Sequence, residues 1–195
     1  MKLFLLFFIL PIYSFDTKEN DFILKNLSPP KQYWEVNGGS CGEACVFSIT
    51  EYLEQNISQK KINQLATKQN RGMYSNELIE VLKKLNIKFK NISFNSSKRT
   101  QFIDKIINKL NSGNPIILGV KIYPDENPKW VCDHFILLVG YNKTTNELIY
   151  NSNDNRERIL IKKILNKENG YSLVHKSNYI FAIEIFLNDK LITYN

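Results

Sequence analysis

The sequence predicts an α+β fold in which helices come first along the chain and an antiparallel β-sheet follows. Up to about residue 110, apolar residues recur at the three- and four-residue spacing of amphipathic helices. After the turn-like "NSGNP" at residues 111–115, the pattern changes to β-branched, nearly continuous apolar runs that are typical of strands. Because 195 residues can build one sizeable core but hardly two, we expect a single domain.

The N-terminal segment "MKLFLLFFILPIYSF" combines one lysine with an apolar run that is short for a bilayer crossing. It predicts a cleaved signal peptide over residues 1–15, with an uncleaved membrane anchor as the alternative. We therefore expect a secreted or extracytoplasmic protein without stable membrane insertion after cleavage. Residues 16–33 are expected to form an extended lead-in, since Pro29 and Pro30 oppose a helix, and residues 34–195 to form the domain.

Four helices are predicted from apolar spacing and capping residues. The first opens near Ser40, Ser58 and Ser75 can cap the second and third, and the fourth spans roughly residues 101–110. Four strands are predicted after them. These are "PIILGVKIY" (115–123), "HFILLVGYN" (134–142), "NELIYN" (146–151) and "YIFAIEIF" (179–186).

The charge pattern excludes some functions. The net charge is +7, but the lysines are dispersed, and the chain has no zinc pattern, no RNA-binding signature and no basic stripe. We expect no nucleic-acid partner. A closed zinc site is also not expected, because it would have to use every cysteine together with His134. Neither a metal nor another cofactor is predicted.

A candidate nucleophile lies in "GGSCGEACVFSITEY", residues 38–52, where a loop becomes a helix. A thiol attacks a carbonyl as its thiolate, and the positive end of a helix dipole stabilises that anion. Cys41 lies at such a helix start, and Gly42 next to it permits a close approach of substrate. Cys45, one turn further on, is expected in the interior.

A nucleophilic thiol needs a base, and the chain has two histidines. His134 begins an apolar strand, where a polar side chain is unusual, whereas His175 lies in the loop-like "LVHKSNY". We therefore expect His134 to be the base and to sustain a thiolate at low pH. An acceptor must orient its imidazole, and Asn151 at the end of the following strand is the candidate, with Asn153 and Asp154 as alternatives.

The order Cys, His, Asn, with a helix before a sheet, resembles the papain superfamily. "SCGEACVFS" is similar to its nucleophile segment, "DHFILLVGYN" to its histidine strand and "LIYNS" to its asparagine segment. The Cys-Gly pair, "GMYSNEL" and "GNPIILGV" resemble more closely the bacteriocin-leader peptidase (C39-like) branch. The resemblance extends from Trp34 to about Phe186.

This resemblance implies a papain-like fold with the nucleophile helix packed on the sheet. It implies a cysteine peptidase or amidase that acts on a peptide or amide substrate through Cys41, His134 and Asn151. Papain's own pattern, shifted by one residue, would choose Cys45 instead of Cys41. The same triad would also serve an acyl transferase, and a pseudopeptidase that only binds peptides is a further alternative.

One position departs from the family pattern. The family has a glutamine about six residues before the nucleophile that helps to bind the oxyanion, and here that position is Glu35. Because an ionised carboxylate cannot donate a hydrogen bond, Asn37 is the expected oxyanion donor, with Gln32 in reserve. Trp130, in the loop before His134, is the expected aromatic contact for the substrate.

Three cysteines in an oxidising compartment allow at most one internal disulfide. If Cys41 and His134 meet, then Cys45 and Cys132, which flank them on the same helix and strand, should also lie close together. A Cys45–Cys132 disulfide is therefore a hypothesis, and two separate buried thiols are the alternative.

Overall fold

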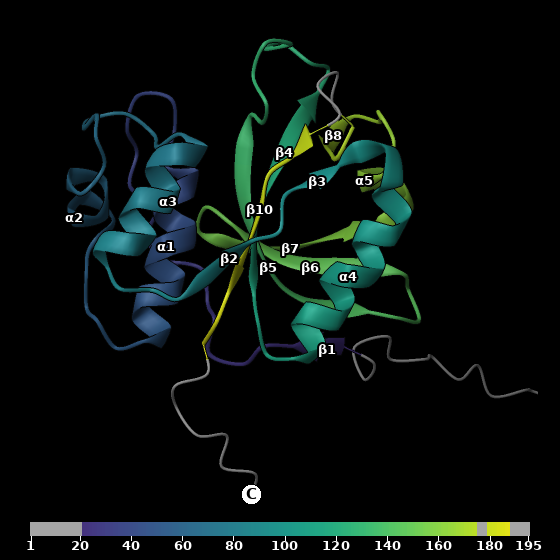
Figure 1. Cartoon of the computed structure of the whole chain (residues 1–195), viewed down its shortest axis with the longest axis horizontal. Helices are drawn as coiled ribbons and strands as arrows, with labels where there is room; N and C mark the ends of the chain where they lie inside the picture. The colour runs from purple at the N-terminus through teal and green to yellow at the C-terminus, as the bar shows by residue number, and fades with distance from the viewer. Residues whose placement is uncertain (1–20, 175–178, 188–195) are drawn as a thin grey trace, which may run out of the picture.

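A computed structural model describes residues 21–174 and 179–187 of the chain. A central antiparallel sheet separates one group of helices, α1 to α3, from α4 and α5 on the opposite side (Figure 1). The predicted signal peptide, residues 1–15, and His175 lie outside the described residues.

The helices follow the predicted caps with one exception. They are α1 (Cys41–Tyr52), α2 (Gln59–Gln64), α3 (Ser75–Lys84), α4 (Arg99–Asn111) and the single turn α5 (Ile161–Ile164), with a 3₁₀ turn at Ser96–Lys98. The Ser58 hydroxyl accepts the Lys61 N–H at 3.2 Å and so caps α2 as predicted. The cap of α3 is Tyr74, not Ser75, because the Glu77 carboxylate accepts the Tyr74 N–H at 2.9 Å.

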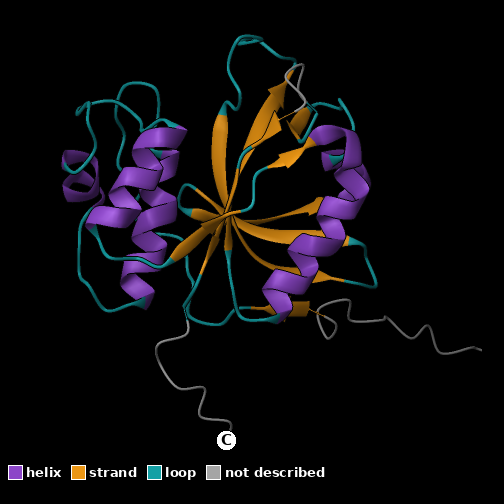
Figure 2. Ribbon diagram, viewed as in Figure 1, coloured by secondary structure: helices purple, strands orange, loops and turns teal. Residues whose placement is uncertain are grey.

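The strands form one large sheet and one small one (Figure 2). They are β1 (Asp21–Ile23), β2 (Phe89–Asn91), β3 (Phe94–Asn95), β4 (Ile116–Tyr123), β5 (His134–Asn142), β6 (Glu147–Ser152), β7 (Asn155–Leu160), β8 (Gly170–Ser172), β9 (Tyr179–Ile180) and β10 (Ala182–Ile185). The main order is β2-β10-β4-β5-β6-β7, with β1 paired to β5 and β8 to β4. Every strand pair is antiparallel.

The predicted strand over residues 179–186 is divided at Phe181. Its first part, β9, pairs with β3 in the small sheet, and its second part, β10, lies between β2 and β4. The strands β2, β3, β7 and β8 were not predicted, because they are short or rich in polar residues and carry no apolar alternation.

Alternating residues of the central strands build two separate cores. On β5, Phe135, Leu137 and Val139 pack into the cluster under α1, α2 and α3. Their neighbours Ile136 and Leu138 belong to the cluster under α4 and α5. The predicted α+β fold, with the nucleophile helix packed on the sheet, is confirmed, and the second layer of helices leaves both faces of the sheet covered.

Part of the lead-in is a strand of the main sheet. Residues 21–23 pair with residues 140–142 of β5. Gly140 permits this pairing, because a β-carbon at that position would overlap the carbonyl oxygen of Phe22. Among the residues described, no helix has the length and apolar character that a bilayer crossing requires.

Candidate active site

Cys41 is the first residue of α1, where the sequence placed the nucleophile. Its Sγ accepts a hydrogen bond from the backbone N–H of Phe135 at 3.4 Å. Phe135 directly follows His134 at the start of β5. The helix start and the start of the histidine strand are therefore in contact at the thiol.

The surroundings of Cys41 keep its thiol protonated. Burial raises its pKa to about 11, and the nearby Glu43 carboxyl adds to the rise. Hydrogen bonds from the backbone N–H groups of Phe135, Gly42 and Cys41 itself work in the opposite direction but are outweighed. The expected low-pH thiolate is therefore wrong for this state, because desolvation exceeds the stabilisation by the helix N-terminus.

His134 is held between a hydroxyl group and an aromatic ring. Its Nε2 lies 2.9 Å from Ser152 Oγ, which in turn lies 3.1 Å from the Tyr171 hydroxyl. The imidazole stacks on the Tyr171 ring with 5.2 Å between centroids and 11° between planes. Burial lowers the pKa of His134 to about 4, so the imidazole is neutral at pH 7.

The other imidazole nitrogen, Nδ1, has no hydrogen-bond partner among the described residues, and no hydrogen bond joins His134 to Cys41 in that part of the chain. Hydrogen bonds between catalytic groups are often long before substrate binds. The arrangement therefore leaves Nδ1 available for a proton.

Asn151, the residue predicted to orient the imidazole, lies on the other face of the sheet. It is paired with Leu137, its Nδ2 donates to the Leu27 carbonyl at 2.8 Å, and its Oδ1 accepts from Arg156 Nε at 3.0 Å. Both ends of the amide are thus engaged away from His134. Ser152, the next residue along β6, makes the imidazole contact instead.

A β-bulge explains this difference. The register of β5 and β6 shifts between Leu138 and Gly140. Had the register seen at Gly140 continued, Asn151 would have been on the face of His134; the extra residue moves it to the opposite face and brings Ser152 there. Of the alternatives, Asp154 is exposed and Asn153 occupies the turn between β6 and β7.

A cavity of about 450 Å³ opens over Cys41. Asn37, Gly38 and Gly39 line one side of it, as do Trp130 and Cys132 from the loop between β4 and β5. The remaining residues that line it are Arg71, Gly72, Met73, Tyr74, Ser75, Val131, Asp133 and Phe135. The predicted oxyanion donor Asn37 and the predicted substrate contact Trp130, which is 50% exposed, therefore share the cavity of the thiol.

Gln32 and Glu35 line a different cavity, of about 680 Å³. Tyr33 also lines that cavity, and its hydroxyl accepts the backbone N–H of Ser40, the residue before Cys41. Glu35 and the reserve donor Gln32 thus lie outside the lining of the thiol's cavity, and the backbone carbonyl of Gln32 accepts a hydrogen bond from Gln59 Nε2 at 2.7 Å.

All three cysteines are free thiols, so the predicted Cys45–Cys132 disulfide is not formed. Cys45 is 4% exposed and points into the core under α1 to α3. Cys132 Sγ instead packs over Gly119, where an added β-carbon would lie 3.0 Å away, and faces the cavity of Cys41. Burial, followed by the charge of Cys41, raises the pKa of Cys132 to about 12.

A buried lysine anchors the loop that carries Trp130. Lys121, 1% exposed, contacts Asp133 at 2.8 Å, Asp125 at 2.9 Å and the Asn127 carbonyl at 2.8 Å. Burial lowers the pKa of Lys121, but hydrogen bonds to the two carboxylates outweigh this and raise it overall. The loop is therefore fixed at its base by a charged cluster beside His134.

Comparison with protein families gives a match over most of the chain. The family described as "Peptidase_C39 like family" matches residues 24–175. No curated protein sequence matches the chain significantly.

Solved structures share the fold at low identity. The peptidase domain of Streptococcus ComA, a bifunctional ABC transporter involved in a quorum sensing pathway, is 16% identical with a TM-score of 0.51. The alignment covers 80% of this chain and 96% of that domain. A double glycine motif protease from an AMS/PCAT transporter, in complex with the leader peptide, is 12% identical with a TM-score of 0.52, over 82% of this chain and 93% of that one. At these identities the likeness establishes the fold.

Proposed function

The chain belongs to the Peptidase_C39-like family of cysteine peptidases, and from that premise we propose that it is a secreted thiol hydrolase that cleaves a peptide or amide bond at Cys41. The observation that carries the proposal is the position of the thiol. Cys41 lines an open cavity at the start of α1 and contacts the residue that follows His134. Nucleophile and base thus come from the two elements that the fold brings together.

The charge states favour proton transfer during attack over a preformed ion pair. Both groups are neutral at pH 7, because burial raises the pKa of Cys41 and lowers that of His134. As the sulfur attacks the substrate carbonyl, His134 Nδ1 takes the thiol proton and then gives it to the leaving amine. Water, activated by the same imidazole, releases the acyl group from sulfur.

Ser152 and Tyr171 position the base. The Ser152 hydroxyl contacts Nε2, the Tyr171 hydroxyl contacts that of Ser152, and the stacked tyrosine ring fixes the plane of the imidazole. Because a fixed Nε2 presents Nδ1 in one direction, this pair performs the orienting role predicted for Asn151. Asn151 itself stays a prediction, which paired variants of the two residues test.

Asn37 is the proposed oxyanion donor. Its side chain is exposed and it lines the cavity beside Gly38 and Gly39. A neutral amide donates to a developing negative charge, which the Glu35 carboxylate cannot do. Loss of such a donor typically lowers the rate by about 10²–10³.

The proposed substrate is a peptide, and the cavity offers it backbone and aromatic surfaces. Gly38, Gly39 and Gly72 expose main chain, and Tyr74 and Trp130 are 57% and 50% exposed. The structural neighbour in complex with a leader peptide supports a peptide substrate. An acyl transferase would use the same residues with an amine or thiol in place of water.

A binding protein without activity is the second candidate. It is favoured by the protonated thiol and by the absence, among the described residues, of a hydrogen bond between Cys41 and His134. A peptide library incubated with the full chain separates the candidates. Peptidase activity yields two new termini and a transient acyl adduct on the Cys41 peptide in mass spectra, transfer yields a ligated product, and a binding protein yields neither.

The proposed secretion rests on residues 1–15, and N-terminal sequencing of the exported protein tests it. A mature terminus close to residue 16 supports a cleaved signal peptide. An intact Met1 in a membrane fraction contradicts it.

A further inference from the structure

Two residues after the nucleophile, a carboxyl group is enclosed inside the protein. Glu43 lies in the first turn of α1 and is 0% exposed. Its Oε1 accepts a hydrogen bond from Asn63 Nδ2 at 2.6 Å. Its Oε2 is buried and has no hydrogen-bond partner, and no cation pairs with the group, among the residues described. The mechanism proposed above does not use this carboxyl group.

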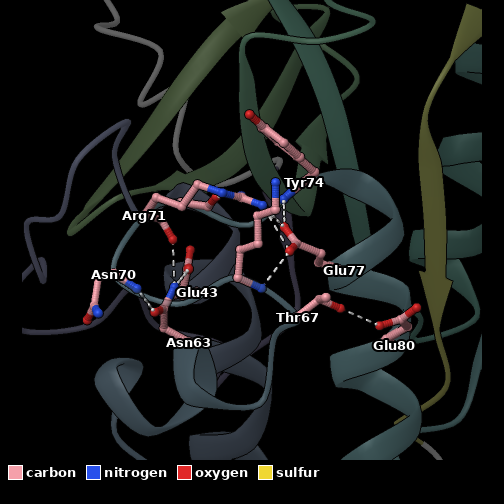
Figure 3. Close-up of polar contacts among 10 residues, drawn as sticks. Glu43, Asn63, Thr67, Asn70, Arg71, Tyr74, Glu77 and Glu80 are labelled. Atoms are coloured by element: carbon pink, nitrogen blue, oxygen red, sulfur yellow. Dashed lines mark hydrogen bonds and ion pairs between the residues drawn. The ribbon is translucent and has the colours of Figure 1, made fainter.

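Asn63 joins Glu43 to one wall of the cavity (Figure 3). Asn63 lies on α2 and is 1% exposed. The same Nδ2 that reaches Glu43 also donates to the Arg71 carbonyl at 2.7 Å, and Oδ1 accepts the Asn70 N–H at 2.9 Å. We call residues 70–74 the wall segment, because residues 71–74 line the cavity of Cys41.

The wall segment in turn touches the loop that leads into Cys41. The Gly72 N–H donates to the Asn37 carbonyl at 3.1 Å. A β-carbon at residue 72 would overlap the Gly39 carbonyl oxygen, so only glycine permits this approach. A shift of the wall segment would therefore move the backbone just before the nucleophile.

A second carboxylate holds the wall segment from α3. Glu77 accepts the N–H groups of Lys68 at 3.0 Å and Tyr74 at 2.9 Å, and it pairs with Arg71 at 2.9 Å (Figure 3). Burial raises the pKa of Glu77, but these hydrogen bonds and the Arg71 charge lower it overall. The Arg71 guanidinium thus pairs with Glu77, and within the described part of the chain no ion pair is formed by Glu43.

Among the described residues, the ionisable groups whose titration is coupled to Glu43 include Cys41 and Cys45 on α1, Glu77 on α3 and Tyr33 before α1. None of them carries a positive charge in any protonation state. Burial raises the pKa of Glu43, the hydrogen bond from Asn63 and the backbone N–H groups of Glu43 itself and of Met73 in the wall segment lower it, and Glu77 adds to the rise. An ionised Glu43 would also raise the pKa of the nucleophile.

We propose that Glu43 is a positioning residue for Cys41: as a neutral acid it holds the wall segment in place through Asn63, and its ionisation weakens the nucleophile. The inference rests on the proposed role of Cys41. The Glu43 side chain thus contributes in two ways. Its hydrogen bond with Asn63 fixes the position of the wall segment, and its protonation state determines whether a negative charge lies near the Cys41 thiol. Because the two contributions respond to different substitutions, each is tested separately.

Glu43→Gln tests the charge, because glutamine keeps the shape and the acceptor oxygen but never ionises. The readout is the alkylation rate of Cys41 by iodoacetamide in the full chain, followed by mass spectrometry of the Cys41 peptide. At about pH 9 we expect the variant to react at least about threefold faster than wild type, and at about pH 5 equally fast. Equal rates at both pH values overturn the charge contribution.

Asn63→Ala is the matched variant, because it breaks the bridge and leaves the acid in place. We expect hydrogen exchange of residues 70–74 to accelerate at least about tenfold and kcat/KM to fall. Since the hydrogen bond from Asn63 lowers the pKa of Glu43, its loss should also move the ionisation of Glu43 to higher pH. Unchanged exchange overturns the bridge. If Glu43→Gln does not fold, a ¹³C titration of the wild-type glutamate carboxyls decides the charge contribution. A carboxyl that stays protonated well above the ordinary pKa of about 4.3 supports it, and normal titration of all of them overturns it.

Alkylation, exchange and titration need no turnover. These three measurements therefore test the role of Glu43 even if the chain cleaves no peptide. A missing peptidase activity would contradict only the proposed function.

Discussion

The helical half of the site and its strand half are built from different interactions. Around Cys41, backbone groups and polar side chains from three helices form a continuous network that contains an ion pair, Arg71–Glu77. Around the His134 imidazole, the polar and ring contacts that the described residues make come from the Ser152 hydroxyl and Tyr171, and burial keeps the ring uncharged. The helical half fixes where the thiol lies, and the strand half fixes the charge and the plane of the base.

This difference indicates how reactivity is divided. In the resting state neither half supplies a charge to the other, since the thiol is protonated and the imidazole is neutral. Substrate binding must therefore bring the Cys41 thiol and the His134 imidazole close enough for the thiol proton to move to the imidazole. Substitutions in the two halves are expected to have distinct signatures in rate, pH dependence and stability.

The largest effect is expected at the thiol. Cys41→Ala should lower kcat/KM by at least about 10⁴ and abolish labelling by an electrophilic probe, because it removes the nucleophile. Cys45→Ala is the matched control. It should keep the labelling and lose about 1 kcal/mol of unfolding free energy, because Cys45 packs in the core. The reverse pattern would assign the nucleophile to Cys45.

His134→Ala should lower kcat/KM by about 10²–10⁴, through loss of the general base. The pH profile of wild type sharpens this test. The active form is the neutral imidazole, and burial lowers the pKa of His134 to about 4, so activity should persist as pH falls and be half lost only near that value. An acid limb of kcat/KM near the ordinary histidine value of about 6.5 would contradict the buried, neutral ring.

Ser152→Ala and Asn151→Ala form a neighbouring pair on opposite faces of β6. Ser152→Ala should lower kcat about tenfold with little change in stability, because it frees the imidazole Nε2. Asn151→Ala should instead cost roughly 1–3 kcal/mol of unfolding free energy, because Leu27 and Arg156 lose a buried partner. Steady-state kinetics measures the change in kcat, and urea denaturation measures the change in unfolding free energy. An exchange of these outcomes would return the orienting role to Asn151.

The smallest effect is expected at the rim of the cavity. Trp130→Ala should raise KM roughly three- to tenfold at nearly constant kcat, because it removes an exposed aromatic contact and no catalytic group. Phe186→Ala, an exposed aromatic residue outside the cavity, is the control and should leave KM unchanged. A fall in kcat for Trp130→Ala would mean that this residue acts on the chemical step.

Sequence patterns were sufficient for the elements that carry strong periodicity. The histidine strand begins and ends at the predicted residues, 134 and 142, and α1 begins directly after Ser40. Both follow from long apolar runs bounded by polar or small residues. Cys41 and Asn37 share a cavity because they are close in sequence, which spacing alone could anticipate.

The rest of the site depended on contacts that spacing does not encode. A single bulged residue in β5 places Ser152 instead of Asn151 beside the imidazole of His134. The sequence pattern does not show where such a bulge occurs. Tyr171 belongs to β8, a three-residue strand without alternation, which reaches the site only through its pairing with β4. The pKa of Cys41 is raised, not lowered as its place at a helix start predicts, because burial, a property of the folded chain, outweighs the backbone N–H groups at the thiol.

The contact between Gly72 and Gly39 has a consequence for how specificity is changed. Backbone meets backbone there, so the exposed side chains of the cavity rim do not set the separation between residues 37–39 and the wall segment. The exposed side chains of Tyr74 and Trp130 can therefore vary without changing that separation. A library randomised at these two positions, with both glycines kept, should redirect substrate choice while every active clone presents its scissile bond to the thiol at the same depth.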